Sequence, residues 1–153
     1  PLIGIYNRLK FNEELDKHVN SSKDQNKNLC LIMLDIDNFK AINDEHGHLV
    51  GDSVIIEMAS LIQSIIRKAD ILARWGGEEF VVILPETNKE EANILTHRLK
   101  RTIEEYSFIK VGHVTCSYGV VALGDDDDRE SLVLRADKLL YEAKGLGKNV
   151  VMG

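Results

Sequence analysis

Acidic side chains stand at two points where apolar segments end or begin. Asp35 and Asp37 are two residues apart at the end of the apolar run 29–36, and Glu78 directly precedes Glu79 and the apolar run that follows. Carboxylate oxygens suit Mg²⁺, which proteins commonly hold through one or two carboxylates together with phosphate oxygens. If the two runs are neighbouring strands, Asp35 and Glu78 converge at one rim of a sheet. A solvated acidic rim fits the same spacing.

Two adjacent glycines precede these glutamates. Gly76 and Gly77 separate the strand-like segments 71–75 and 80–85, as in a two-residue hairpin turn whose central residues both have positive φ. Such a turn would let a phosphorylated ligand come close to the acids. Because successive strand residues point to opposite faces, the two glutamates after the turn are expected to have different roles.

Other polar residues are suited to bind a nucleotide. Lys40 could meet a phosphate as a point charge. Asn43 and Asp52 could read a purine edge together, because asparagine donates and accepts while aspartate accepts from a ring N–H or an exocyclic amine. Lys144 and Lys148 could approach a phosphate tail. Capping, turn formation and basic residues at the negative end of a helix are the alternative explanations for each residue alone.

The elements that must position these residues alternate between helix and strand. The run 29–36 is apolar throughout, which is typical of a central strand covered on both faces. Segments 71–75 and 80–85 predict a hairpin, 114–123 predicts a further strand and 149–153 could add an edge strand. Apolar spacing of three or four residues predicts helices. These helical patterns are carried by Phe11, Leu15 and Val19, by Val54, Met58, Leu61 and Ile65, by Ala92, Leu95, Leu99, Ile103 and Tyr106, and by Val133, Ala136, Leu140 and Ala143.

Composition narrows the class of protein. The chain has 153 residues and a net charge of −6, which argues against nonspecific binding to a nucleic acid polymer, since that requires a basic face. No apolar run approaches the roughly 20 residues that span a bilayer, and the start shows no signal-peptide pattern. Cys30 and Cys116 lie in apolar segments, so we expect two buried thiols. One domain over residues 1–153 in a cytoplasmic setting is expected.

The segment GGEEF at 76–80 resembles the signature of the GGDEF family of diguanylate cyclases. The likeness extends to PLIGIYNR (1–8), LDIDNFKAINDEHGHLVGD (34–52), SYGVV (117–121) and RADKLLYEAKGLGKN (135–149). It implies an α/β (α+β) fold similar to the palm of nucleotidyl cyclases and polymerases. In that fold a central mixed, mainly antiparallel sheet is surrounded by helices, and a β-hairpin carries the signature. Ile3 departs from the threonine that is common in the opening segment.

The activity that the resemblance implies is condensation of two GTP into cyclic di-GMP with release of pyrophosphate. By position, Asp35 and Glu78 would bind Mg²⁺ with the backbone carbonyl of Ile36, and Mn²⁺ could replace Mg²⁺. Glu79 would be a further catalytic acid, either as a ligand or as a base. Each domain would hold one GTP, so the resemblance implies a twofold homodimer for catalysis. The homodimer could be transient.

The resemblance also assigns the nucleotide contacts. Asn43 and Asp52 would bind guanine, and Lys40, Lys144 and Lys148 would contact phosphates. The family usually carries an upstream regulatory domain, which this sequence does not include. The chain could therefore act as the cytoplasmic part of a membrane-anchored protein.

A second site is expected upstream of the signature. Arg67 and Asp70 form an RxxD motif at the spacing of the family's inhibitory site, and Arg98 matches the position of a second arginine. An arginine fork suits phosphate and a guanine edge, whereas a surface Arg–Asp pair is the alternative. Product inhibition by cyclic di-GMP is predicted. Two other functions are alternatives: a noncatalytic cyclic di-GMP receptor and a GTP-binding regulatory module. The intact acids of the signature disfavour both.

Overall fold

A five-stranded sheet runs through residues 5–153, the part of the chain that the computed structural model describes. Its strands are β1 (Leu29–Ile36), β2 (Ile71–Arg74), β3 (Glu79–Pro85), β6 (Cys116–Ala122) and β7 (Val151–Met152). Their order is β2-β3-β1-β6-β7, and β6–β7 is the parallel pair among antiparallel ones. The mixed, mainly antiparallel sheet expected from the sequence is confirmed. The opening residues 1–4, Ile3 among them, lie outside the described range.

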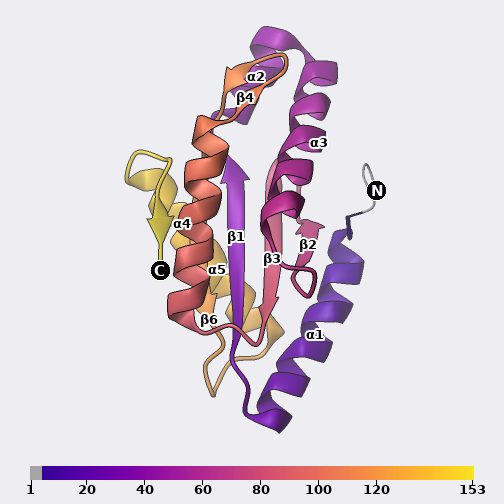
Figure 1. The fold of residues 1–153 in the computed structure, drawn as a ribbon, viewed down its shortest axis with the longest axis vertical. Helices are drawn as coiled ribbons and strands as arrows, with labels where there is room; N and C mark the ends of the chain where they lie inside the picture. The colour runs from indigo at the N-terminus through magenta and orange to yellow at the C-terminus, as the bar shows by residue number, and fades with distance from the viewer. Residues whose placement is uncertain (1–4) are drawn as a thin grey trace.

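Five helices cover the two faces of this sheet in the described residues: α1 (Arg8–Gln25), α2 (Phe39–His46), α3 (His48–Ile65), α4 (Lys89–Glu105) and α5 (Arg129–Gly145). Figure 1 shows α3 and α4 on the near face of the sheet and α5 behind it. Side chains cap three of the helices: Asn7 accepts from the Lys10 N–H, and Asn88 and Asp128 begin capping boxes. Each such cap typically stabilises a helix by about 1 kcal/mol.

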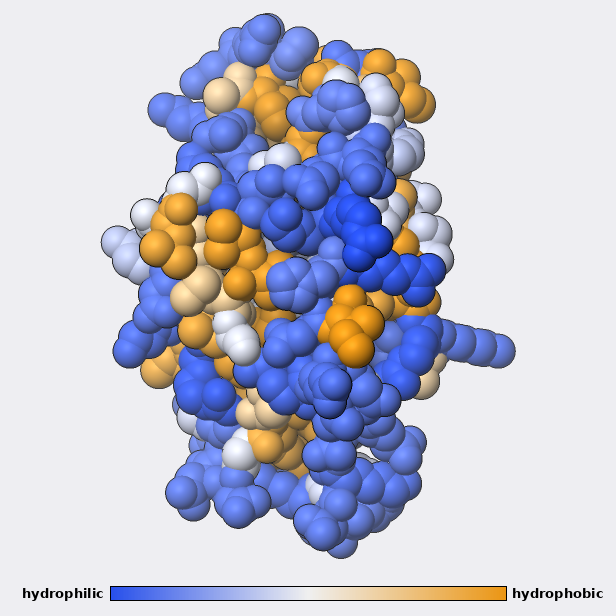
Figure 2. All heavy atoms as spheres, turned by 60° about the vertical axis from the view of Figure 1, so that its left-hand side comes forward, coloured by the Kyte–Doolittle hydropathy of each residue, from blue (hydrophilic) through white to orange (hydrophobic). Residues whose placement is uncertain are grey.

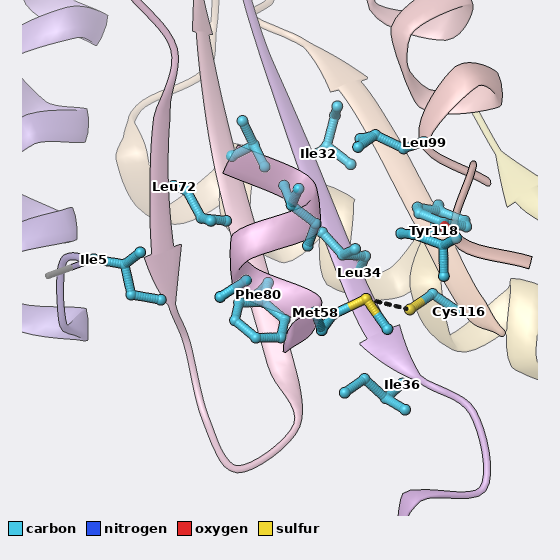
Figure 3. Close-up of a cluster of buried hydrophobic side chains, with 14 of the residues drawn as sticks. Ile5, Ile32, Leu34, Ile36, Met58, Leu72, Phe80, Leu99, Cys116 and Tyr118 are labelled. Atoms are coloured by element: carbon cyan, nitrogen blue, oxygen red, sulfur yellow. Dashed lines mark hydrogen bonds between the residues drawn. The ribbon is translucent and has the colours of Figure 1, made fainter. Parts of the chain in front are cut away.

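The alternation of side chains along β1 divides the core in two. Cys30, Ile32, Leu34 and Ile36 pack with α3 and α4, in the cluster that Figure 3 shows in part. The residues between them, such as Met33, pack with α1 and α5. Every β1 side chain is buried, as predicted for a central strand. Asp35, the next residue on the Met33 side, therefore faces the α1 and α5 layer at the end of the strand.

A four-residue loop joins β2 and β3. Neither Gly76 nor Gly77 has a positive φ, so the expected two-residue turn is wrong. The Trp75 N–H donates to the Glu79 carbonyl at 2.8 Å, and the Arg74 guanidinium donates to both glycine carbonyls, with Nη2 2.7 Å from the Gly77 oxygen. Because a side chain closes the wider loop, the backbone does not need the left-handed conformation of a tight turn.

The segment after β1 forms two consecutive helices, α2 and α3. Gly47, with a φ of 90°, separates α2 from α3. Further along the chain, β4 (Ser107–Phe108) and β5 (Gly112–His113) pair as a short hairpin that the sequence did not predict. Strands of two residues are too short to show alternating hydrophobicity.

The surface is mostly hydrophilic. Figure 2 shows hydrophobic side chains in separate patches among hydrophilic ones on one face of the molecule. Isolated apolar side chains are ordinary on a protein surface. Among the described residues, the helices are too short or too polar to span a bilayer.

Candidate active site

Acidic residues from two strands and a loop meet at one end of the sheet. Asp35 of β1 and Glu79 of β3 are direct cross-strand partners, so their side chains lie on the same face. Glu78 belongs to the preceding loop, and its carbonyl accepts the Ile36 N–H at 3.2 Å. The sequence placed the start of the strand one residue later, at Phe80. The pairing partner of Asp35 is therefore Glu79, and strand alternation does not set the direction of Glu78.

Asp35 is the most buried of these acids. Its side chain is 5% exposed, and its Oδ2 lies 2.8 Å from the Lys144 Nζ of α5. Its Oδ1 is buried without a hydrogen-bond partner among residues 5–153. Burial raises the pKa of Asp35 from 3.8 to about 6, and Lys144 offsets part of that effect. A buried carboxylate oxygen without a donor fits a cation, because an unpaired buried charge is otherwise costly.

The neighbouring acids also favour a positive charge at this position. Burial raises the pKa of Glu79, and Asp35, Asp137 and Glu78 raise it further. In the described part of the chain, no group of three or more histidine, cysteine or acidic side chains is placed to hold a metal by itself. Carboxylates such as those of Asp35 and Glu79 suit Mg²⁺, which proteins commonly hold through one or two carboxylates together with phosphate oxygens.

The signature loop contacts the start of α1. The Arg8 guanidinium lies 3.9 Å from the centre of the Trp75 ring, and Phe11 packs edge-on against the same ring at 5.4 Å. A cavity of about 660 Å³ opens beside this loop. It is lined by residues 5–8, by Ile55 and Ala59 of α3 and by residues 74–77. This cavity borders the signature loop, but Asp35 does not line it.

The two residues expected to read a purine edge come from adjacent helices. Asn43 lies on α2 and packs against the backbone of Gly51 on α3, where a Cβ would come within 1.8 Å of the Asn43 Oδ1. That Oδ1 is buried without a partner in the described residues. Asp52 directly follows Gly51 and is exposed, as is Lys40 at the start of α2. Phe39 packs against the core.

Two of the three candidate phosphate lysines, Lys144 and Lys148, lie on either side of the end of α5. Lys144 contacts Asp35 directly, as described above. Lys148 follows the helix with a φ of 67°, and its Nζ donates to the Asn38 Oδ1 at 2.6 Å. No sequence motif gives Asn38 a role. Its contact joins segments 110 residues apart, so no local pattern could have revealed it.

Asp37 does not share the position of Asp35. β1 ends at Ile36, so Asp37 lies beyond the strand, and strand alternation does not place its side chain on the same side as that of Asp35. The buried Asp37 carboxylate accepts from Thr115 Oγ1 and Ser117 Oγ, each at 2.7 Å, and from the Asn149 N–H at 3.0 Å. Donors occupy both of its oxygens.

The residues of the expected inhibitory site are also brought together. Arg67 Nη2 lies 2.9 Å from Asp70 Oδ1 and 2.6 Å from Thr87 Oγ1. The Asp70 side chain is fully buried, whereas that of Arg67 is 52% exposed. Arg67 and Arg98 line a cavity of about 280 Å³ with Thr87 and Glu91. Thr87 could not be identified from the sequence, because its contact with Arg67 depends on the fold at the end of β3.

Comparison with known proteins gives a consistent result. The family model described as "Diguanylate cyclase, GGDEF domain" matches residues 1–150. The chain is 42% identical over 157 residues to Diguanylate cyclase VdcA of Vibrio cholerae, an alignment that covers 99% of this chain and 45% of that protein. The chain spans less than half the length of VdcA and of other curated relatives that it matches at similar identity.

Solved structures agree with the sequence match. The GGDEF domain of DgcB from Caulobacter crescentus, crystallised in complex with c-di-GMP, aligns with a TM-score of 0.94 at 31% identity and covers 99% of this chain and 90% of that chain. The active GGEEF domain of a diguanylate cyclase from Vibrio cholerae aligns with a TM-score of 0.92 at 35% identity and covers 97% and 96%. The chain therefore belongs to the GGDEF-domain family of diguanylate cyclases.

Proposed function

We propose that this chain condenses two molecules of GTP into cyclic di-GMP and releases pyrophosphate. The observation that carries the proposal is the Asp35 carboxylate, which is buried beside the signature loop with one oxygen on Lys144 and the other without a donor among residues 5–153. This arrangement favours a site that binds a cation and phosphates together. Membership of the family supports the choice of GTP.

The residues of the chain would bind and orient the nucleotide. Asn43 and Asp52 hold the guanine edge, which sets the position of the ribose and its 3′-hydroxyl. Lys40 and Lys148 contact phosphate oxygens, and Lys144 adds positive charge beside Asp35. Much of the catalysis in phosphoryl transfer comes from such positioning and charge stabilisation.

The acids would hold the metal that this chemistry requires. Asp35 and Glu78 supply carboxylate oxygens and Ile36 a backbone carbonyl. Mg²⁺ or Mn²⁺ in that position would stabilise charge on the phosphate and lower the cost of deprotonating the attacking hydroxyl. Glu79 is the partner of Asp35 across the strands and is the candidate to bind a metal or to accept the hydroxyl proton.

Catalysis by this route needs two copies of the chain. One domain binds one GTP, and the cyclic product contains two nucleotides related by a twofold axis. The two sites must therefore face each other in a symmetric homodimer. The GTP bound to each protomer supplies one α-phosphate and one 3′-hydroxyl.

We also propose that cyclic di-GMP inhibits the enzyme at Arg67, Asp70 and Arg98. Arg67 is held by Asp70 and Thr87, which orients its exposed guanidinium before a ligand arrives. Arg98 lines the same cavity from α4. Two arginine forks in one groove are suited to bind phosphate groups and guanine edges.

The direct test is incubation of the pure protein with GTP and Mg²⁺, followed by chromatographic detection of cyclic di-GMP. We expect product from the wild type, none from Glu78→Ala, and wild-type yield from Glu105→Ala, which removes an exposed acid at the end of α4. A protein that binds cyclic di-GMP but releases no pyrophosphate from GTP would instead be a receptor, and the proposed activity would be wrong.

A further inference from the structure

The loop after α5 holds three consecutive residues in a left-handed conformation. Gly147, Lys148 and Asn149 have φ values of 107°, 67° and 50°. Residues other than glycine adopt this region rarely, and they remain there when surrounding contacts require it. Lys148 is a candidate phosphate ligand, so the position of its side chain depends on whatever holds this loop in place.

The Asp37 carboxylate binds the backbone of this loop at Asn149. Its Oδ2 accepts the Asn149 N–H at 3.0 Å and the Thr115 hydroxyl at 2.7 Å, and its Oδ1 accepts the Ser117 hydroxyl at 2.7 Å. The Asp37 side chain is buried. Buried hydrogen bonds to a carboxylate are stronger than neutral ones, so Asp37 fixes the Asn149 backbone relative to β6.

Two further contacts restrain the same loop. Lys148 Nζ donates to the Oδ1 of Asn38, the residue after Asp37. The Asn149 Nδ2 donates to the Glu104 Oε2 of α4 at 2.8 Å. The segment that follows β1 thus holds the loop at two points. Asp37 binds the Asn149 backbone, and Asn38 binds the Lys148 side chain.

We propose that Asp37 is a positioning residue that keeps Lys148 at the phosphate site through its hydrogen bond to the Asn149 backbone. Asp37 itself touches no substrate. Donors occupy both of its oxygens, whereas Asp35 has one oxygen without a partner among the described residues. The two aspartates of the same short motif therefore have separate tasks, one toward the cation and one toward the loop. This inference rests on the proposed GTP site.

Four variants separate the hydrogen bond from general damage. Asp37→Ala removes the acceptor of the Asn149 N–H. Asp37→Asn keeps it, because an amide oxygen can accept from Asn149 and Thr115 while the amide nitrogen donates to the Ser117 hydroxyl. Ser117→Ala removes a partner from the other oxygen and serves as the matched control. Asn149→Val keeps the N–H but disfavours the left-handed conformation, and it tests the loop if Asp37→Ala does not fold.

The first measurement needs no ligand. NMR follows hydrogen exchange of the backbone N–H of residue 149. Exchange should be slow in the wild type, Asp37→Asn and Ser117→Ala, and faster in Asp37→Ala and Asn149→Val. Unchanged exchange in Asp37→Ala would overturn the proposal.

The second measurement compares the affinities for GTP and GMP in the presence of Ca²⁺. Asp37→Ala and Asn149→Val should weaken GTP binding about tenfold, as expected when one hydrogen bond to a charged group is lost, and should change GMP binding less than twofold. Equal losses for both ligands would indicate a structural role only and would overturn the proposal. If the wild type binds no GTP while Asn149 exchange still depends on Asp37, the proposed function and the phosphate role fail, and Asp37 remains an anchor of the loop.

Discussion

At the scale of single residues, Asp35 shows how a buried carboxylate lowers the stability of the folded chain. Its pKa is raised from 3.8 to about 6 in the folded protein, chiefly by burial. Below pH 3.8 the group is protonated in both the folded and the unfolded chain. As the pH rises from about 4 to about 6, the unfolded chain loses this proton first, so the folded state loses stability. Above pH 6 the loss is complete and corresponds to about 3 kcal/mol.

Asp35→Asn should therefore increase stability at neutral pH while abolishing cyclase activity. Without divalent ions, we expect the free energy of unfolding to rise by about 1–3 kcal/mol at pH 7.5 and to change little at pH 4. Denaturant titrations at both pH values measure this. Asp44→Asn, at an exposed position on α2, is the control and should change little at either pH. A gain of equal size at both pH values would contradict the role of burial.

Gly51 matters because its missing side chain leaves room for the Asn43 side chain. A Cβ at this position would come within 1.8 Å of the Asn43 Oδ1, which is the free end of a flexible side chain. Alanine in the interior of a helix is otherwise more favourable than glycine by about 1 kcal/mol. Gly51→Ala should therefore leave the protein folded and turn the Asn43 side chain away from the base.

We expect Gly51→Ala to raise the KM for GTP about tenfold with a small change in melting temperature, since a hydrogen-bonding side chain leaves the guanine site. The decisive comparison uses the Asn43→Ala background, in which the clash no longer exists. There, Gly51→Ala should change the KM less than twofold. Additive effects of the two substitutions would show that Gly51 acts by another route.

At the scale of elements, the connections around β2 and β3 bring distant residues together. Arg67 follows α3, Thr87 precedes α4 and Arg98 lies on α4, and all three line one cavity. The two proposed sites lie at opposite ends of β3. Glu79 of the candidate active site begins this strand, and Pro85, whose carbonyl accepts from Arg67, ends it.

Removing the inhibitory arginines should separate regulation from turnover. We expect Arg67→Ala and Arg98→Ala to raise the cyclic di-GMP concentration that halves the rate by at least about tenfold, because each loses a charged hydrogen bond to phosphate, and to leave the initial GTP turnover near that of the wild type. Arg98→Ala is the safer variant, since Arg67 also neutralises the buried Asp70. Arg101→Ala, elsewhere on α4, is the control. Inhibition that survives in both variants would place the product site elsewhere.

At the scale of the whole molecule, the acids and the nucleotide residues gather at one end of a single sheet. In Figure 1, β1 points toward α2 at that end, while the connection from α1 into β1 lies at the other. A site at one end of an elongated chain can meet a second copy of itself through a twofold axis. One protomer contains one such set of residues.

The rate per protomer should therefore fall on dilution, in proportion to concentration once the protein is mostly monomeric. Initial rates over a wide range of protein concentrations at saturating GTP measure this. A constant rate per protomer would exclude an obligate dimer. Excess Asp52→Ala, which should not bind guanine, should also suppress the wild-type rate by forming mixed dimers, whereas excess albumin should not.

Much of the architecture could be predicted from local patterns. The all-apolar segment of β1, the apolar spacing of the helices and the capping role of Asn7 depend on neighbours within a few residues. The same holds for the motif residues, because Asp35, Asn43 and Arg67 stand in recognisable segments. The glycine turn could not be predicted in detail, because the Arg74 guanidinium, rather than glycine backbone freedom, closes the loop.

The sequence by itself determined the order and type of the main elements and the family to which the chain belongs, since hydrophobic periodicity and short motifs are local properties. The tertiary structure alone decided which acid faces the lysine of α5 and which one binds the loop after that helix. Asp35 and Asp37 are alike in the sequence, but Asp35 lies within the buried strand β1, one residue before its end, and Asp37 lies beyond it. Their partners come from residues about 80 to 110 positions away. Pairing of β1 with β6 and packing of the sheet against α5 bring these distant groups into contact.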